Sequence, residues 1–399
     1  MKVCFLCNEY PPTRHGGIGI ATRTLAQSLV EAGHEARVIG FYPQDEPAPE
    51  HETDNGVVVT RLKCDSRRFG WIRARRRLYH AVADLAKAGL IDIVEAPDYQ
   101  GLLAGWPKLP VPAIVRMHGS SSYFAVEMGQ RPERLTFRLE RASLRRADFL
   151  CSTSRYTAEQ SKKIFSLPGA EAFVVYNSTV MLAEKPAGPR QPGKVVFSGT
   201  LTPKKGVISL VRAWGKVVKE CPNAVLHMFG KAGLTNNGVS MQDYLVSCLS
   251  NETRDTVRFL GHVTATELKE NLRTATVAIF PSYSEAFALA PMEAMAEACP
   301  TIYTRRSSGT ELIEDGKNGL LIDPDDVDGI AAAIVRVLKD ANLAKALGDA
   351  GRETIELRFT PDGMIARNVN FFSDCVRAFK DRDSGRRPLV AEFQGTKPE

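Results

Sequence analysis

Two glutamates, Glu285 and Glu293, lie eight residues apart in the segment PSYSEAFALAPME at 281–293. The segment follows a continuous apolar run at 277–280 that is typical of a buried strand, and the residues from 287 to 298 predict a helix. Eight residues along a helix span about 12 Å. Because a carboxylate accepts hydrogen bonds from neighbouring hydroxyls, the pair would suit the two ends of a nucleotide sugar, with hexose at one and ribose at the other.

Between the glutamates, the backbone amides of Phe287, Ala288 and Leu289 fall at the predicted helix N-terminus, where a diphosphate could bind. Upstream, Lys205 lies in SGTLTPKKG at 198–206, which joins another predicted strand to its helix. A lysine at the carboxyl end of such a strand can reach a phosphate. Two glutamates alone would more often be a cap and a solvated face, so the lysine is what favours an anion site.

Apolar runs and helical periodicity alternate along the whole chain. In the first half, strands are predicted at 3–6, 36–41, 57–62, 91–94, 113–117, 149–152 and 173–176, with helices at 18–32 and 72–87. In the second half, strands are predicted at 195–198, 225–229, 257–260, 277–280 and 301–304, with helices at 208–219, 239–250, 264–273 and 287–298. Such alternation is typical of parallel α/β sheets with helical crossovers.

The segment AEKPAGPRQPG at 183–193 holds three prolines and two glycines and predicts a linker. We therefore predict two doubly wound, Rossmann-like domains over 1–185 and 186–360, a crossover helix at 361–380 that returns to the first domain, and a polar tail at 381–399. Ligands bind at the carboxyl ends of strands in such sheets, so we expect the two domains to face each other across one cleft.

Positive charge is concentrated in the first half. Residues 1–185 hold 25 Lys+Arg and 20 Asp+Glu, so +5, which leaves 52 − 25 = 27 against 46 − 20 = 26, so +1, for the remainder. Arginines cluster at 67–77 and at 131–146. The second cluster, in RLTFRLERASLRR at 134–146, interleaves apolar residues, which is compatible with a helix lying on an anionic membrane and equally with a stripe that packs inward. A nucleic-acid partner is not expected.

The chain has no apolar run of about 18 residues, the length a membrane span needs, and its N-terminal apolar run at 3–7 is too short for a signal peptide. These features predict a cytoplasmic protein, at most peripheral on the cytoplasmic face of a membrane. Two Asp-x-Asp triplets, at 323–325 and 381–383, could suggest a metal site. Pro324 and the helical pattern after it instead indicate a turn and an N-cap, and the second triplet lies in the tail. We expect neither a metal nor another cofactor.

Several segments occur together in a recognisable order: GGIG at 16–19, RMHG at 116–119, VVYNS at 174–178, SGTLTPKKG, FLGHV at 259–263, SEAFALAPME and SSGTELIEDGKNGLLIDP at 307–324. In these motifs the chain resembles the retaining glycosyltransferases of family 4, which have the GT-B fold. The resemblance covers about residues 1–375. It implies a two-domain transferase and says little about the sugar.

The resemblance also implies residue roles. Glu293 resembles the glutamate that binds the nucleotide ribose, Glu285 the one facing the hydroxyls of the donor sugar, and Lys205 the lysine on the diphosphate. His118 resembles the histidine beside the sixth carbon of the donor sugar. We therefore predict His118, Glu285 and Lys205 as catalytic residues. The predicted substrate-binding residues are Gly17, Gly19, Asn177, Thr200, His262, Phe287, Ala288, Leu289 and Glu293.

Among these, Gly17 and Gly19 resemble the loop that closes over phosphate and acceptor, and His262 lies where backbone groups hold the base.

The chain departs from the family pattern at three places. Thr200 replaces an arginine that helps to neutralise the diphosphate, Ala286 and Ala288 replace glycines, and Ser178 replaces the glycine after Asn177. Alanine keeps the backbone amides but disfavours positive φ, so the loop before the helix should hold ordinary backbone angles.

The predicted reaction moves a hexose from a UDP- or GDP-sugar to a hydroxyl of a saccharide or lipid-linked acceptor, with retention, in polysaccharide or glycolipid biosynthesis. A nucleotide-sugar epimerase on the same fold and a non-catalytic sugar-nucleotide binder are the alternatives. The departures at Thr200, Ala286 and Ala288 are what suggest the binder.

Overall fold

The computed structural model describes residues 1–13, 16–64, 70–181, 188–235 and 237–383. The chain divides into two compact units, Met1–Tyr176 together with the chain from Asp362 onward, and Asn177–Pro361. Residues 182–187 of the predicted linker and residues 384–399 of the predicted tail lie outside the described residues.

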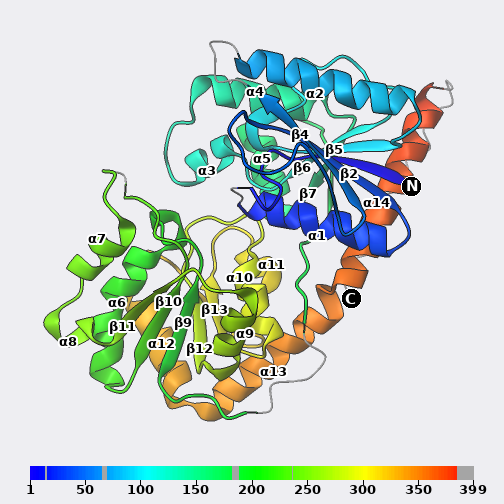
Figure 1. Cartoon of the computed structure of the whole chain (residues 1–399). Coiled ribbons are helices and arrows are strands. Elements are labelled where there is room, and N and C mark those ends of the chain that lie inside the picture. Colours follow the sequence, from blue (N-terminus) through cyan, green and yellow to red (C-terminus); the bar gives the residue numbers. More distant parts are fainter. Residues whose placement is uncertain (14–15, 65–69, 182–187, 236, 384–399) are drawn as a thin grey trace. The chain divides into compact units, whose positions relative to one another are not determined.

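An eight-stranded sheet forms the first unit, in the order β3-β4-β2-β1-β5-β6-β7-β8 (Figure 1). Its strands are β1 (Lys2–Leu6), β2 (Glu35–Pro43), β3 (His51–Asp54), β4 (Val57–Cys64), β5 (Ile93–Pro97), β6 (Ala113–Met117), β7 (Phe149–Ser152) and β8 (Ala172–Val174). The helices are α1 (Gly17–Glu31), α2 (Gly70–Lys87), η1 (Tyr99–Gly101), α3 (Ser121–Glu127), α4 (Arg134–Arg146), α5 (Arg155–Ile164) and α14 (Pro361–Asp383).

One pairing in this sheet was not predicted. Strand β3 runs antiparallel to β4, whereas the other neighbouring strands are parallel. The two strands meet at Asn55 and Gly56, which have φ of 48° and 84°. Positive φ at both central residues is the geometry that a two-residue hairpin needs, and Asn-Gly adopts it readily. Because β3 is a short polar edge strand, His-Glu-Thr-Asp, the apolar pattern did not reveal it.

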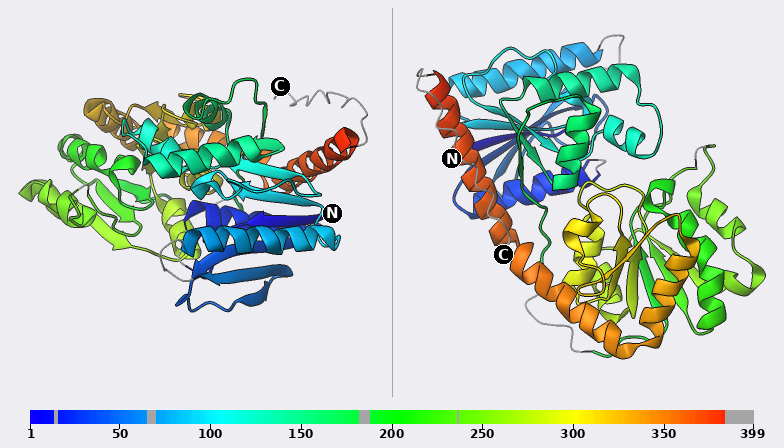
Figure 2. Two further views of the ribbon diagram at one scale, coloured as in Figure 1. Left: turned by 90° about the horizontal axis from the view of Figure 1, so that it is seen from above. Right: turned by 180° about the vertical axis from the view of Figure 1, so that it is seen from behind.

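Helices cover both faces of the first sheet. Helices α2, α4 and α5 lie on one face of the sheet, and α1 and α14 lie on the other (Figure 2). Buried side chains of α2, α4 and α5 form one hydrophobic cluster with residues between 102 and 109, and those of α1 and α14 form a second cluster. The predicted C-terminal helix that returns to the first unit is therefore confirmed. Its residues Phe371 and Phe372 are buried, and the Phe371 ring stacks on Phe173 with centroids 4.7 Å apart.

A buried ion pair within the sheet is hydrogen-bonded to α14. Arg116 on β6 donates to both carboxylate oxygens of Glu95 on β5, at 2.8 and 2.7 Å, and also to Oδ1 of Asn368 on α14 at 2.6 Å. All three side chains are buried. Because each charge has a partner, the cost of burying it is offset, and the helix is fixed in register by a polar contact as well as by its aromatic side chains.

The second unit has a six-stranded, fully parallel sheet in the order β11-β10-β9-β12-β13-β14. Its strands are β9 (Lys194–Ser198), β10 (Val225–Phe229), β11 (Val257–Gly261), β12 (Val277–Phe280), β13 (Thr301–Thr304) and β14 (Leu320–Ile322). Its helices are η2 (Pro203–Lys205), α6 (Val207–Glu220), α7 (Met241–Ser247), α8 (Asn251–Arg254), α9 (Ala265–Thr274), α10 (Leu289–Ala296), α11 (Gly309–Leu312), α12 (Val327–Lys339) and α13 (Ala341–Arg358). The prediction of two doubly wound sheets is confirmed.

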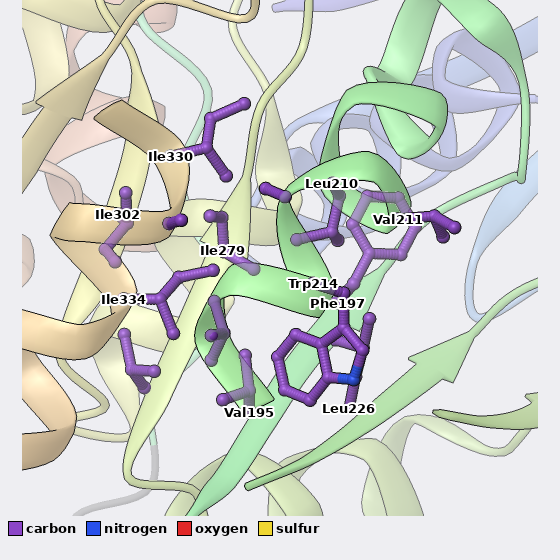
Figure 3. Close-up of a cluster of buried hydrophobic side chains, with 14 of the residues drawn as sticks. Val195, Phe197, Leu210, Val211, Trp214, Leu226, Ile279, Ile302, Ile330 and Ile334 are labelled. Carbon is purple, nitrogen blue, oxygen red and sulfur yellow. The ribbon is translucent and has the colours of Figure 1, made fainter. Parts of the chain in front are cut away.

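The core of this unit is built around β9. Figure 3 shows Val195 and Phe197 of β9 beside Trp214 of α6, with Ile279 of β12 and Ile334 of α12 in the same cluster. Trp214 is completely buried, and its Nε1 donates to the hydroxyl of Thr256 at 2.8 Å. This packing fixes the strands whose carboxyl ends carry the predicted site.

Each sheet has one point where the chain reverses its direction of winding. In the first sheet β1 lies between β2 and β5, and in the second β9 lies between β10 and β12. Loops that leave adjacent strands in opposite directions open a crevice at the strands' carboxyl ends, which is where ligands bind in such sheets. We therefore expect ligand-binding sites at the loops after β1 and β5 and at those after β9 and β12.

Candidate active site

The loops after β9 and β12 are in direct backbone contact. The amide of Tyr283 donates to the carbonyl oxygen of Lys204 at 2.8 Å. Gly206, with φ of 69°, packs so closely that a Cβ atom there would lie 1.8 Å from the carbonyl oxygen of Pro281. Only glycine satisfies both the backbone angle and the space, so this residue sets how the two loops meet.

This contact brings two predicted catalytic residues together. Lys205 Nζ lies 2.6 Å from Oε1 of Glu285, which is buried, and the amide of Glu285 donates to the hydroxyl of Ser307 at 3.2 Å. Burial alone would raise the pKa of the Glu285 carboxyl, but Lys205 and Lys204 outweigh it and hold that pKa below its ordinary value. At neutral pH the site therefore holds a charged carboxylate in contact with an ammonium group.

The helix after β12 begins later than predicted. Helix α10 starts at Leu289, with Ala288 as its N-cap at φ −75° and ψ 137°, and ends at Ala296. The predicted start at Phe287 was wrong, and because Glu285 lies before the helix, the helical rise no longer supports the predicted spacing of about 12 Å between the two glutamates. The N-cap residue, an alanine, makes no side-chain cap hydrogen bond. The first amides of a helix have no intrahelical acceptor and point outward from its N-terminus, which is the orientation that an anion requires.

The two alanines adopt the ordinary backbone angles that were predicted for them. Ala288 has negative φ, and Ala286 is not among the described residues with positive φ. The loop therefore does not need the glycines of the family pattern to hold its shape.

Glu293 lies one turn into α10 and is half-buried. Burial raises the pKa of its carboxyl, and Lys269 only partly offsets this. Among the described residues, no donor forms a hydrogen bond with this carboxylate, in contrast to Glu285. Glu293 can therefore accept hydrogen bonds from ligand hydroxyls without breaking an internal contact.

Asn177 supports the same loop from a distance of 110 residues along the chain. Its Nδ2 donates to the carbonyl oxygen of Phe287 at 2.9 Å. The buried Phe287 ring also lies 5.5 Å from the Phe359 ring, centroid to centroid. The side chain of Asn177 thus orients the peptide that precedes α10, and its predicted direct contact with substrate stays a prediction.

Replacing Asn177 with aspartate is expected to weaken nucleotide binding more than replacing it with alanine does. Alanine loses one hydrogen bond, about 1 kcal/mol or fivefold in affinity, whereas a carboxylate would face the Phe287 carbonyl and repel it. Isothermal titration with UDP and GDP measures the difference, with Ser178→Ala as the neighbouring control. An aspartate variant that binds as tightly as wild type would show that this contact does not shape the site.

Three glycines join the carboxyl ends of the neighbouring strands. The Gly230 amide donates to the Gly261 carbonyl at 2.7 Å, and a Cβ atom on Gly230 would lie 2.0 Å from the Gly199 carbonyl oxygen. The exposed residues Thr200 and His262 follow these glycines, so both lie on the edge of the sheet that carries Lys205. The roles predicted for them in substrate binding stay predictions.

In the first unit, His118 follows β6. Its amide donates to Oδ1 of Asp98 at 3.0 Å, and burial together with Arg116 lowers the pKa of its imidazole to about 3. The ring is therefore neutral at physiological pH and offers one donor and one acceptor rather than a charge. Its predicted place beside the donor sugar stays a prediction.

Two buried acids that sequence reasoning missed hold the loop that carries His118. Asp98 is completely buried, and burial raises the pKa of its carboxyl to about 7. Glu140 accepts hydrogen bonds from the Ser120 hydroxyl at 2.9 Å and the Ser122 amide at 3.1 Å. An acid directly after the buried run 93–97 was a usable signal for Asp98. The sequence around Glu140, in an arginine-rich helix, gave none.

The glycine-rich segment after β1 is more helical than predicted. Helix α1 starts at Gly17, with Gly16 as N-cap, so Gly17 and Gly19 lie in its first turn rather than in a loop. The Gly19 amide donates to Oε1 of Glu9 at 2.8 Å. Residues 14 and 15 of the same motif lie outside the described residues.

A cavity of about 350 Å³ opens at this point, where β1 and β5 are neighbours. It is lined by Cys7, Asn8, Glu9, Gly16, Ile18, Pro97, Tyr99, Gln100 and Leu102. Asn8 Nδ2 donates to Oε1 of Gln100 at 2.7 Å, so polar side chains from both strand ends meet in the cavity wall. Amide and carboxylate groups of this kind can hydrogen-bond to sugar hydroxyls.

The first Asp-x-Asp triplet has a structural role. Arg306 lies 2.7 Å from Asp323 and 2.6 Å from Asp325, and the Tyr283 hydroxyl donates to Asp325 at 2.9 Å. The N-cap of α12 is the next residue, Asp326, which accepts from the Gly329 amide at 2.8 Å. The triplet thus forms a turn that holds the loop bearing Tyr283.

Comparison with known proteins identifies relatives of both units. The family model described as "Glycosyl transferase 4-like domain" matches residues 16–178, and "Glycosyl transferases group 1" matches residues 182–354. The chain is 27% identical to an uncharacterised glycosyltransferase of Methanocaldococcus jannaschii over 93% of this chain and 98% of that protein. It is 26% identical to a glycogen synthase of Mycobacterium tuberculosis over 90% and 91% of the two chains.

A solved structure supports the same assignment at the level of fold. Sucrose-phosphate synthase from Thermosynechococcus elongatus superimposes with a TM-score of 0.78 at 22% identity, covering 95% of this chain and all of that one. Both units and the C-terminal helix therefore have counterparts in one known architecture.

Proposed function

This chain belongs to the group 1 glycosyltransferases, the retaining family 4 enzymes with the GT-B fold, and we propose that it moves a hexose from a UDP- or GDP-sugar to a saccharide or lipid-linked acceptor hydroxyl in polysaccharide or glycolipid biosynthesis. The observation that carries the proposal is the charged Lys205–Glu285 contact at the reversal point of the second sheet, beside the uncapped N-terminus of α10. One side of this site suits a diphosphate and the other suits sugar hydroxyls.

In this proposal the chemistry rests on positioning and charge. The Lys205 ammonium and the first amides of α10 stabilise the negative charge that develops on the departing diphosphate. Glu285, kept ionised by the two lysines, accepts hydrogen bonds from the donor sugar, and Glu293 accepts from the ribose. The leaving phosphate helps to deprotonate the acceptor on the same face, which retains the anomeric configuration. The polar cavity at β1 and β5 supports acceptor binding in the first unit.

A thermal-shift screen with UDP-, GDP- and ADP-sugars, followed by an assay for free nucleoside diphosphate, tests the function. A ligand at 100 times its Kd stabilises a protein by about 2.7 kcal/mol. We expect one base to stabilise the wild type and donor hydrolysis to release its nucleoside diphosphate. The Glu293→Ala variant should lose more of the ligand-induced thermal stabilisation than the Glu285→Ala variant. The reason is that the ribose contact is made by both the donor and the free nucleotide.

The exposed Glu353 on α13 provides a matched control, since Glu353→Ala removes the same charge from the same unit. Interconversion of two nucleotide sugars without release of nucleoside diphosphate would show that the protein is an epimerase and not a transferase. Binding without any turnover, with or without saccharide acceptors, would replace it with a binding protein.

A further inference from the structure

The two arginine-rich helices of the first unit pack on one stretch of chain. From α2, Arg75 donates to the carbonyl oxygens of Gln100 and Gly101, the latter at 2.6 Å. From α4, Arg146 donates to the carbonyl oxygen of Trp106 at 2.7 Å. Helices α2 and α4 therefore lie on the same face of the first sheet (Figure 2).

The outer surface of α4 and of the first half of α2 is rich in arginine, and the exposed acids Glu133 and Asp84 lie at its borders. On α4 the only acid, Glu140, is buried, and on α2 no acid precedes Asp84. The exposed charged side chains between Gly70 and Leu78 and between Arg134 and Arg146 are Arg73, Arg76, Arg77, Arg134, Arg138 and Arg145. This surface, which we call the α2/α4 face, is complementary in charge to an anionic partner.

Apolar side chains are exposed beside these arginines, but only in part at the positions that the sequence suggested. The apolar stripe of α4 packs mainly inward, since Leu144 is buried and the Phe137 ring stacks on Phe165 at 5.2 Å. Leu135, however, is 49% exposed, and Trp71 and Ile72, in the first turn of α2, are 43% and 39% exposed. A tryptophan beside cationic side chains is typical of segments that sit at the membrane–water interface.

We propose that the α2/α4 face docks on an anionic membrane, with its arginines on the lipid phosphates and Trp71, Ile72 and Leu135 in the interfacial layer. The same face is tied to the cavity of the first unit, because Arg75 binds the backbone of Gln100, a residue of the cavity wall. The inference rests on the proposed function in one respect: it specifies an acceptor carried on a lipid, presented to that cavity at the membrane surface. Within the described residues, no helix is long and apolar enough to span a bilayer.

Co-sedimentation with phosphatidylcholine vesicles, with and without phosphatidylglycerol, tests the proposal on the full chain. We expect binding only to the anionic vesicles, weakening as salt shortens the Debye length to about 8 Å at physiological strength. Each arginine near the surface contributes about fivefold in affinity, so the double variant Arg76→Gln/Arg138→Gln should bind about 25-fold more weakly. Trp71→Ala should weaken binding further without changing the charge.

The control is Arg212→Gln/Lys219→Gln, which removes two exposed charges from α6 of the second unit and should bind like the wild type. Equal binding to neutral and anionic vesicles, or equal binding by the two double variants, would overturn the proposal. So would binding to RNA or to an acidic polypeptide in place of vesicles. Donor hydrolysis in vesicle-free solution, measured on the same proteins, separates failure of the membrane proposal from failure of the transferase proposal, because the α2/α4 variants should retain it.

Discussion

Replacing Lys205 with alanine is expected to lower turnover about a hundredfold. The ammonium group lies at the reversal point of the second sheet, beside the amides of α10, where charge on a leaving diphosphate would develop. Removing one such contact typically costs about 3 kcal/mol, or roughly a hundredfold in rate. Steady-state kinetics on the donor measures the effect, and Lys219→Ala on the exposed side of α6 is the control.

A second experiment distinguishes two roles of Lys205: binding the diphosphate, and keeping Glu285 ionised. If Lys205 acts only by holding Glu285 ionised, the double variant Lys205→Ala/Glu285→Gln should have the same turnover as Glu285→Gln alone. If it also binds phosphate, the double variant should lose further affinity for free UDP or GDP. Thr200→Arg, which adds a cation at the same edge of the sheet, should then recover part of the activity of Lys205→Ala. An unimpaired Lys205→Ala enzyme would mean that another group neutralises the phosphates.

Replacing Gly206 with alanine is expected to destabilise the second unit by about 3 kcal/mol and to abolish most activity. The new Cβ would meet the Pro281 carbonyl at 1.8 Å and would also require a non-glycine residue at φ of 69°. The loops after β9 and β12 would have to separate, which would break the alignment of Lys205 with Glu285. For a unit of this size the loss corresponds to a fall in Tm of roughly 6–12 °C.

Gly215, nine residues later in α6, is the matched control. A Cβ atom there meets nothing within 4 Å, and the residue is exposed in mid-helix. Gly215→Ala should therefore raise stability by about 0.5–1 kcal/mol through helix propensity. Calorimetry measures the Tm of both variants. A Gly206→Ala protein as stable as wild type would mean that the loops after β9 and β12 can separate with little loss of free energy.

The sequence was most informative where structure depends on local pattern. The apolar run 113–117 became β6 without a shift of boundary, and the two alternating series of runs became two sheets. Placing Lys205 and Glu285 at strand ends followed from the same pattern, since adjacent parallel strands end at one edge. Their direct contact did not, because it depends on how Gly206 packs on Pro281, seventy-five residues away.

Long-range contacts account for two further differences. The start of α10 depends on a loop held by Asn177 and Phe359 as well as on its own residues. The role of Asp98 depends on the pairing of β5 with β6, because its hydrogen-bond donor is the amide of His118, which follows β6. Polar contacts between distant residues leave no periodicity in the sequence, whereas apolar packing does.

The burial of Phe371 and Phe372 against the first sheet bears on how the chain folds during its synthesis. Domains generally fold in order as they leave the ribosome. Here β1 is made first, yet the hydrophobic cluster that covers it includes residues 364–375, and the Arg116–Glu95 pair receives its third partner from Asn368. The second unit, continuous from Asn177 to Pro361, is complete before that segment emerges. The unit whose strands are translated first therefore finishes folding after the second unit has been made, because the part of its sheet that α14 covers stays exposed until residues 364–375 emerge.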